Sequence, residues 1–239
     1  MKDAVLFDLG NTLVQYYRRQ EFPALLERAI LEVQSYLQEQ GLLTVPADLM
    51  WQRVAEENHE AADHQVRSLE GRLARIFELD PAHGVGVVEA ICRRFTTPIF
   101  ARGRPYEDTL PVLRQLRSAG IRTAIVSNAP WGSPGALWRE ELERLGLSQW
   151  VDAVVFCTDV GWRKPARPIV QFALAKLGVE RQNCLFVGDD PRWDLAGPQA
   201  IGIEALLIDR HGTAAETPGT SIHNLHEVWS RLRSRPYRL

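Results

Sequence analysis

Polar side chains that suit phosphate chemistry follow apolar runs at four places in this sequence. Asp8 follows the apolar run 4–7, and Thr12 lies four residues further on. The other groups lie in the second half of the chain: Ser127-Asn128 after "TAIV", Lys164 directly before Pro165, and Asp189, Asp190 and Asp194 in "GDDPRWD". A carboxylate can act as a covalent nucleophile or bind a hard cation, and a lysine can neutralise phosphate charge. These residue types would therefore suit a phosphate group and a metal ion.

Each of these groups has an ordinary explanation when it is taken alone. An aspartate at the end of a strand is more often a helix cap than a nucleophile, and Ser-Asn after a strand is common in turns. A lysine before proline usually lies in a solvated loop, and three acids in six residues can form a charged loop. Their order, and their placement on successive strand ends, favour a common site.

The elements that would carry these groups alternate between strands and helices. Strands are predicted at residues 4–7 and in "TAIVSN", "AVVF", "CLFVGDD" and "EALLID", with helices between the later ones. Such alternation is typical of βαβ units, so we expect an α/β fold with a Rossmann-like parallel sheet flanked by helices. Ligands of open parallel sheets lie beyond the carboxyl ends of the strands, where all four groups are expected to meet.

Residues 15–100 have a different pattern and are predicted to form an all-helical insert. Apolar side chains recur there at helical spacing. They are Phe22, Leu26, Ile30, Val33 and Leu37, then Leu49, Met50 and Val54, then Val66, Leu69, Leu73 and Ile76, then Val88, Ile91 and Phe95. Because the strand at 4–7 must join the later sheet, we expect two domains: an α/β core of residues 1–14 and 101–239, and a helical cap of residues 15–100.

Composition narrows the class of protein. The 239 residues are 45% hydrophobic and 24% charged, with a formal net charge of −2, so nothing indicates a nucleic-acid or membrane partner. No apolar run approaches the roughly 18 residues that could span a membrane, and the N-terminus does not resemble a signal peptide. Cys92, Cys157 and Cys184 show no zinc spacing and imply no disulfide framework. We expect a cytoplasmic monomer or homodimer whose basic tail, Arg231, Arg233, Arg235 and Arg238, is a solvated helix end.

The four groups and the helical insert together resemble the haloacid dehalogenase superfamily, most closely its phosphatase branch with a C1-type helical cap. The resemblance covers residues 1–14 and roughly 104–210, where all four motifs stand in the family's order. It implies a hydrolase in which Asp8 attacks phosphorus and forms an aspartyl-phosphate, which water then hydrolyses.

The resemblance also implies a Mg²⁺ site. Its ligands would be Asp8, the backbone carbonyl of Gly10 and Asp189, while Asp194 would hold a metal-bound water or orient Lys164. Mg²⁺ typically takes one or two carboxylates together with several waters, which agrees with this set.

A phosphate held beside a carboxylate needs positive charge and hydrogen-bond donors. Lys164 would supply one charge, and Ser127 would hold phosphoryl oxygens together with the backbone amides that follow it and those that follow Asp8. Thr12 and Asn128 are expected to contact the substrate. That substrate is expected to be a small-molecule phosphate ester or acyl phosphate.

The sequence departs from the family pattern at Gly10. Phosphatases of the family usually carry an aspartate two residues after the nucleophile, where it protonates the leaving alcohol and then activates water. Glycine cannot donate a proton, and the neighbouring Asn11 can hydrogen-bond but not titrate. General acid–base catalysis is worth about 10²–10⁴ in rate, so this loss is substantial.

Several explanations of Gly10 stay open. The leaving group can be good enough to need no acid, as in an acyl or aryl phosphate, or the cap can supply an acid such as His59, Asp63 or His64. The reaction can also be 2-haloacid dehalogenation, which needs neither that acid nor a metal, or the chain can be a weakly catalytic binding or regulatory protein. Phosphonoacetaldehyde hydrolysis requires a cap lysine, and residues 15–100 contain none.

Substrate specificity in such caps comes from side chains that close over the leaving group. Inward-facing arginines would favour an anionic leaving group, and an apolar lining would favour aryl or lipid-like groups or haloacids. The candidates are Tyr16, Tyr17, Trp51, His64, Arg67 and Arg72 in the cap, with Trp162 and Arg163 beside Lys164.

Overall fold

The computed structural model describes residues 2–80, 84–210, 212 and 220–233. Its centre is a parallel sheet in the order β5-β4-β1-β6-β7-β8. The strands are β1 (Ala4–Phe7), β4 (Arg122–Ser127), β5 (Ala153–Phe156), β6 (Cys184–Gly188), β7 (Glu204–Ile208) and β8 (Ser221–Ile222). The predicted α/β class with a Rossmann-like parallel sheet is confirmed.

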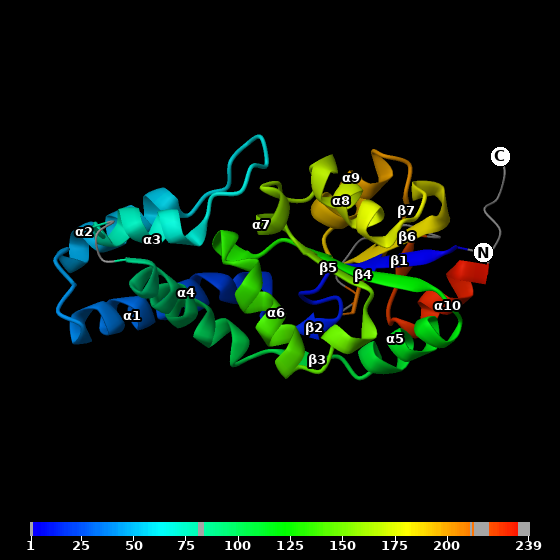
Figure 1. Ribbon diagram of the computed structural model, residues 1–239, viewed down its shortest axis with the longest axis horizontal. Coiled ribbons are helices and arrows are strands. Elements are labelled where there is room, and N and C mark those ends of the chain that lie inside the picture. Colours follow the sequence, from blue (N-terminus) through cyan, green and yellow to red (C-terminus); the bar gives the residue numbers. More distant parts are fainter. Residues whose placement is uncertain (1, 81–83, 211, 213–219, 234–239) are drawn as a thin grey trace.

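Helices cover both faces of this sheet. They are α5 (Thr109–Ser118), α6 (Gly135–Arg144), α7 (Cys157–Val160), α8 (Arg167–Leu177), α9 (Ala196–Gln199) and α10 (His226–Arg233). In Figure 1, α8 and α9 lie along one face and α5 and α10 along the other. Gly178 ends α8 in the left-handed conformation (φ 62°), which is the usual role of glycine after a helix.

Four further helices form the insert between β1 and α5. They are α1 (Phe22–Glu39), α2 (Ala47–Glu57), α3 (Leu69–Phe77) and α4 (Gly84–Phe100). Helix α1 buries its apolar stripe against α4, and Ser68 caps α3 by accepting a hydrogen bond from the amide of Gly71. The four helices extend from the side of the core to which the carboxyl ends of the strands point (Figure 1).

Four features of the fold were not in the sequence-based prediction. The chain enters and leaves the insert through a short antiparallel pair, β2 (Val14–Gln15) and β3 (Arg104–Pro105). A π-helical turn, Pro191–Leu195, precedes the short α9, and β8 completes the sheet beside β7. The predicted third helical stripe begins at Leu69, so Val66 lies in the loop before α3.

The cysteines and the described part of the basic tail lie as the sequence predicts. Cys92, Cys157 and Cys184 are buried and free. Arg231 and Arg233 lie in the last turn of α10, whereas Arg235 and Arg238 lie outside the described residues. Among the helices described, none combines the length and the apolar content needed to cross a membrane.

Gly132 packs against the backbone of the insert and should not tolerate a side chain. It has φ +69°, and a Cβ atom there would lie 2.1 Å from the carbonyl oxygen of Arg67. We expect Gly132→Ala to lower the free energy of unfolding by at least about 3 kcal/mol, because backbone strain and a backbone clash add.

Gly146 provides a matched control for this prediction, measured by chemical denaturation. It has the same φ of +69°, and a Cβ atom would meet nothing within 4 Å. Gly146→Ala should therefore cost only about 1–2 kcal/mol, the strain of the left-handed backbone. Equal losses in the two variants would show that the contact between Gly132 and Arg67 contributes little.

Candidate active site

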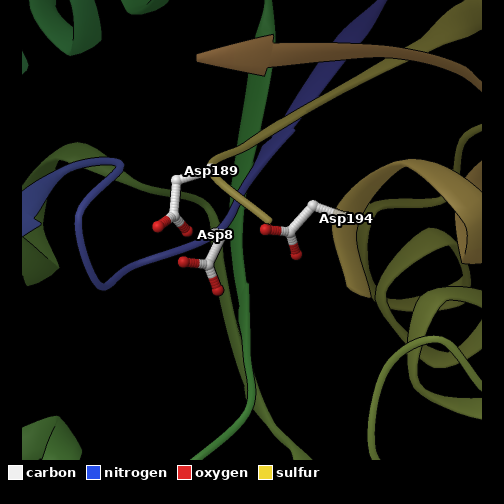
Figure 2. Close-up of side chains that lie close together, drawn as sticks. All are labelled: Asp8, Asp189 and Asp194. Carbon is white, nitrogen blue, oxygen red and sulfur yellow. The ribbon is translucent and has the colours of Figure 1, made fainter. Parts of the chain in front are cut away.

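The carboxyl ends of the central strands bring the predicted polar groups together. Asp8 follows β1, Ser127 ends β4, and Asp189 and Asp194 follow β6. Oxygen atoms of the three aspartates lie within 4.8 Å of one another. Figure 2 shows their carboxylates converging from the end of β1 and from the segment after β6.

Lys164 lies at the centre of this cluster and is almost completely buried. Its Nζ atom is 2.5 Å from Oδ1 of Asp8 and 2.7 Å from Oδ1 of Asp194, and it donates to the carbonyl of Val126 at 2.8 Å. Burial opposes the charged form of Lys164, but the carboxylates of Asp194 and Asp8 more than offset it and raise its pKa. The lysine is therefore held as a cation between two carboxylates.

The oxygen atoms of Asp8 differ in their surroundings. Oδ1 accepts hydrogen bonds from Lys164 and from Oγ of Ser127, the latter at 3.1 Å. Within the described part of the chain, Oδ2 has no hydrogen-bond or ion-pair partner. One oxygen is thus fixed by the protein, and the other is available to a ligand.

Asn128 holds the segment that carries Lys164. Its Oδ1 atom accepts from the amide of Lys164 at 2.8 Å, and its Nδ2 atom donates to the carbonyl of Lys164 at 3.2 Å. The amide of Ala129 donates to Sγ of Cys157, and the amide of Asn11 donates to the carbonyl of Val14. These two amides are therefore already bonded within the protein, although the sequence analysis expected amides here to hold phosphoryl oxygens.

The acids after β6 have raised pKa values. Burial, together with the charges of Asp8 and Asp194, raises the pKa of Asp189 to about 8, and Lys164 opposes this rise. Burial likewise raises the pKa of Asp194 to about 6, against the lowering effect of Lys164. Three carboxylates thus share one buried lysine, which leaves an excess of negative charge.

This arrangement fits a hard divalent cation. Carboxylate oxygens are the donors that Mg²⁺ prefers, and the cluster holds three carboxylates beside one lysine. Both oxygens of Asp194 already have partners, Lys164 and the amide of Asp190, so Asp8 and Asp189 are the freer donors. Gly10 lines the same cavity.

The carboxylate cluster leads to a prediction about pH and Mg²⁺. The folded pKa of Asp189 is about 8 and lies above its unfolded value, so the folded state binds more protons between these values. Without metal, the free energy of unfolding should therefore fall as the pH rises from about 6 to about 8.5, by roughly 1–3 kcal/mol.

Added Mg²⁺ should raise the melting temperature more at the upper end of this range, because the ionised carboxylates are the ligands. Thermal unfolding with Mg²⁺ or with chelator would measure both effects, and Asp189→Asn should abolish most of the pH slope. A Mg²⁺ effect that shrinks as the pH rises would contradict the prediction.

A cavity of about 490 Å³ lies between the strand ends and the insert. The core contributes the polar cluster to its lining, and the insert contributes the segment 16–23 and the loop after α2. Asp190, Arg192, Trp193 and Arg163 also line it. Its volume is in the usual range for a small-molecule site.

The loop 58–68 of the insert is attached to the core loop that carries Lys164. The amide of Val66 donates to the carbonyl of Gly161, and the amide of Arg163 donates to the carbonyl of His64, both at 2.9 Å. Glu60 adds ion pairs to Arg163 at 3.4 Å and to the buried Arg72 at 3.2 Å. The wall of the cavity formed by the insert is therefore joined to the polar cluster.

Several residues singled out from the sequence do not line this cavity. Thr12 is completely buried, and neither it nor Trp51, Asp63 or Trp162 is among the lining residues. Arg67 and Arg72, considered as anion binders, instead hold the loop of the insert: Arg67 pairs with Glu57, and Arg72 donates to the carbonyl of Glu57. Neither arginine is among the described residues that line the cavity.

The candidate acids of the insert are also occupied or remote. His59 lines the cavity, but its Nδ1 atom lies 2.7 Å from the carbonyl of Glu56 and its Nε2 atom 2.7 Å from Arg67. Glu60 lies between two arginines and forms ion pairs with Arg72 and Arg163. His64 does not line the cavity and packs edge-on against Trp193.

The sequence did not predict the contacts that the loop after α2 makes with the core. Asn58 accepts a hydrogen bond from Nε1 of Trp131, and Glu60 reaches Arg163 across the cavity. Both pairs join residues that lie more than 70 positions apart, so local periodicity carries no information about them.

Comparison with known proteins shows similarity to hydrolases. A family model described as "Hydrolase: haloacid dehalogenase-like hydrolase" matches residues 2–202. The glyceraldehyde 3-phosphate phosphatase of Methanothermobacter thermautotrophicus is 34% identical over 117 residues, so the match spans about half of either protein (49% of this chain, 50% of the relative). The glyceraldehyde 3-phosphate phosphatase of Methanopyrus kandleri is 29% identical over 211 residues, which cover 88% of this chain and 85% of the relative.

Solved structures show the same architecture. The crystal structure of the 2-haloacid dehalogenase from Pseudomonas syringae pv. Tomato DC3000 matches with a TM-score of 0.71 over 97% of this chain and 99% of that one. The two sequences are 22% identical, so this likeness describes the fold.

Proposed function

The chain belongs to the haloacid dehalogenase-like hydrolases, and from this premise we propose that it is a Mg²⁺-dependent phosphatase. Its substrate is a small phosphate ester or acyl phosphate, and the reaction passes through an aspartyl-phosphate on Asp8. The observation that carries the proposal is the group of buried Asp8 and Lys164 with half-buried Asp189, which combines a fixed nucleophile, a cation and a further oxygen ligand.

The reaction has two steps at Asp8. A carboxylate oxygen attacks phosphorus, the bond from phosphorus to the leaving oxygen breaks, and the leaving group departs with the electron pair. Water then attacks the phosphorus of the aspartyl-phosphate, which releases phosphate and restores the carboxylate. Phosphoryl transfer depends mostly on positioning and charge, and the contacts of Asp8 supply both.

Each polar side chain has a proposed part in these steps. Lys164 neutralises charge and, through its contact with Asp8, fixes the carboxylate. Ser127 donates to Asp8 and lies where a phosphoryl oxygen would be held. Asp194 positions Lys164. Asn128 holds the backbone of that lysine by hydrogen bonds, and its predicted contact with the substrate is a second role.

Magnesium would be held by Asp8, Asp189 and the carbonyl of Gly10, with Asp194 in the surrounding shell. When bound, it would supply positive charge against the phosphate. A role of Thr12 in substrate binding stays a prediction; its buried position suits a structural part in the turn after Asp8.

The division into a core of residues 1–14 and 101–239 and a cap of residues 15–100 is part of the proposal. The short pair of β2 and β3 supports it, because the chain passes between the two parts only there. The cap would exclude water and contact the leaving group. Cytoplasmic location and a monomeric or dimeric state also stay predictions.

Dehalogenation is the main competing activity, since a dehalogenase shares the fold and Gly10 removes the usual acid. The excess of buried carboxylates favours the phosphatase, because displacement of halide by Asp8 would not need a cation. Asp189 would then be a half-buried acid, with a pKa raised by burial and by its acidic neighbours, and without a purpose in the reaction.

Release of inorganic phosphate tests the proposal directly. The purified protein would be given a panel of phosphate esters and acetyl phosphate, with Mg²⁺ or with chelator, and halide release from 2-haloacids would be measured in parallel. Turnover that requires Mg²⁺ supports the phosphatase. Halide release without phosphate release would establish the dehalogenase, and release of neither would point to a binding protein.

A further inference from the structure

Aromatic side chains form much of the cavity wall, and this bears on the leaving group of the proposed phosphatase reaction. Six aromatic residues line it: Tyr16, Tyr17, Phe22, Trp131, Trp138 and Trp193. The phosphate has its own polar partners at the strand ends, so the aromatic lining is left for the rest of the substrate.

Two of these rings lie together at the entrance to the insert. Tyr17 and Phe22 are half-buried, their ring centroids are 5.5 Å apart, and their planes differ by 32°. The hydroxyl group of Tyr17 has no hydrogen-bond partner within the described residues. This pair therefore offers two adjacent, tilted aromatic rings and one free donor.

Trp193 provides aromatic surface from the core side. It follows Asp189 and Asp190 in the π-helical turn after β6, and it is half-buried. Arg192 lies over its ring at 4.8 Å, and His64 meets it edge-on. The polar cluster and this ring thus come from the same short segment.

The deeper rings are held by other contacts and shape the cavity. Trp131 stacks on Phe95 with centroids 5.5 Å apart, and its Nε1 atom donates to Asn58. Trp138 and Tyr16 meet edge-on at 5.5 Å. These three lining rings are almost fully buried, whereas Tyr17, Phe22 and Trp193 are half-buried and are the more available surface for a substrate.

The leaving group also has to depart without an acid at position 10. Among the lining residues described, Asp189 is assigned to the metal and Glu60 is paired with arginines. Both nitrogens of His59 have neighbours, and Asp190 is bonded to Arg192. Burial raises the pKa of Tyr17, so its phenol can hydrogen-bond to an oxygen but gives up its proton reluctantly. A phenol, with a pKa of about 10, leaves far more easily as its anion than an alkyl alcohol does.

We propose that the substrate is an aryl phosphate, whose aromatic leaving group is held by Tyr17, Phe22 and Trp193. The inference rests on the proposed function and names its substrate class. In the reaction the bond between Asp8 and phosphorus forms, the bond from phosphorus to the aryl oxygen breaks, and the electron pair stays on the phenolate. The phenolate takes its proton from solvent after release.

Four substrates distinguish the effect of an aromatic ring on binding from the effect of a good leaving group on turnover. Acetyl phosphate has a good leaving group and no ring, and phenyl phosphate has both. Phenylethyl phosphate has a ring and a poor leaving group, and glycerol phosphate has neither. We expect phenyl phosphate to show a KM at least about tenfold below that of acetyl phosphate, because ring contacts add to binding.

Variants then test which residues hold the ring. Phe22→Leu and Trp193→Leu should each raise the KM for phenyl phosphate about three- to tenfold and leave that for acetyl phosphate within twofold. Phe172→Leu is the matched control, because Phe172 is an exposed aromatic residue outside the cavity.

The outcomes distinguish the two proposals. Mg²⁺-dependent turnover of acetyl phosphate, with the same KM for acetyl phosphate as for phenyl phosphate, would overturn the proposal of an aryl substrate. It would leave the proposed phosphatase activity standing. Faster turnover of glycerol phosphate than of phenyl phosphate would also overturn it. Absence of phosphate release from all four substrates would instead remove the phosphatase on which the inference rests.

Discussion

An Asp8→Asn variant is expected to lose at least about a thousandfold of any phosphate-releasing activity while keeping its fold. The amide cannot form the covalent intermediate, and removal of a nucleophile typically costs 10³ or more in rate. Lys164 would retain Asp194 at 2.7 Å and the carbonyl of Val126 at 2.8 Å, so the buried cation stays paired. The melting temperature should therefore change by only a few degrees.

Two measurements distinguish this loss from general damage. Mass spectrometry of acid-quenched wild-type protein should find a phosphoryl group on the segment 4–14, and the Asp8→Asn protein should show none. Asp48→Asn, an exposed acid in the first turn of α2, is the matched control and should retain full activity. Activity that survives in Asp8→Asn would mean that the nucleophile is another group.

Gly10→Asp is expected to increase turnover of alkyl phosphates by about 10²-fold or more. It places a carboxylic acid two residues after the nucleophile, and general acid catalysis is worth about 10²–10⁴ in rate. The site has room for the change: a Cβ atom at Gly10 would meet only the ring of Tyr16, at 4.0 Å, and the backbone there needs no left-handed conformation. Turnover of phenyl phosphate and acetyl phosphate should increase much less, because their leaving groups depart without a proton.

The Gly10→Asn variant distinguishes the effect of proton donation by the new side chain from the effect of its size. Asparagine has nearly the same shape as aspartate but cannot titrate, so this variant should show no gain with alkyl phosphates. The pH dependence of kcat in Gly10→Asp should also acquire a new limb that the wild-type protein lacks. If both variants behave alike, the missing acid does not limit the reaction.

Local patterns in the sequence predicted the parts of the fold that depend on neighbouring residues. Helix α1 was predicted because Leu26, Ile30, Val33 and Leu37 recur at helical spacing, and the structure buries these side chains. The strand ends were predictable because parallel strands point their carboxyl ends to one edge, which brings Asp8 near Asp189.

Other features depend on contacts between distant segments, and the sequence could not predict them. Asn128 was expected at the substrate, but its side chain bonds to both backbone groups of Lys164, 36 residues away. Arg72 was considered as an anion binder, but it is fully buried and bonds to the loop after α2. A residue type indicates which bonds a side chain can make, and only the fold determines the partner.

The central position of β1 has a consequence for how the protein is made. This strand pairs with β4 on one side and β6 on the other, so that Ala4 lies opposite Arg122 and Cys184. This strand leaves the ribosome before either of its two neighbours, and such distant pairing slows folding. Asp8 follows this strand, so a nascent or truncated chain that ends before Cys184 would have its nucleophile on a strand still lacking one neighbour.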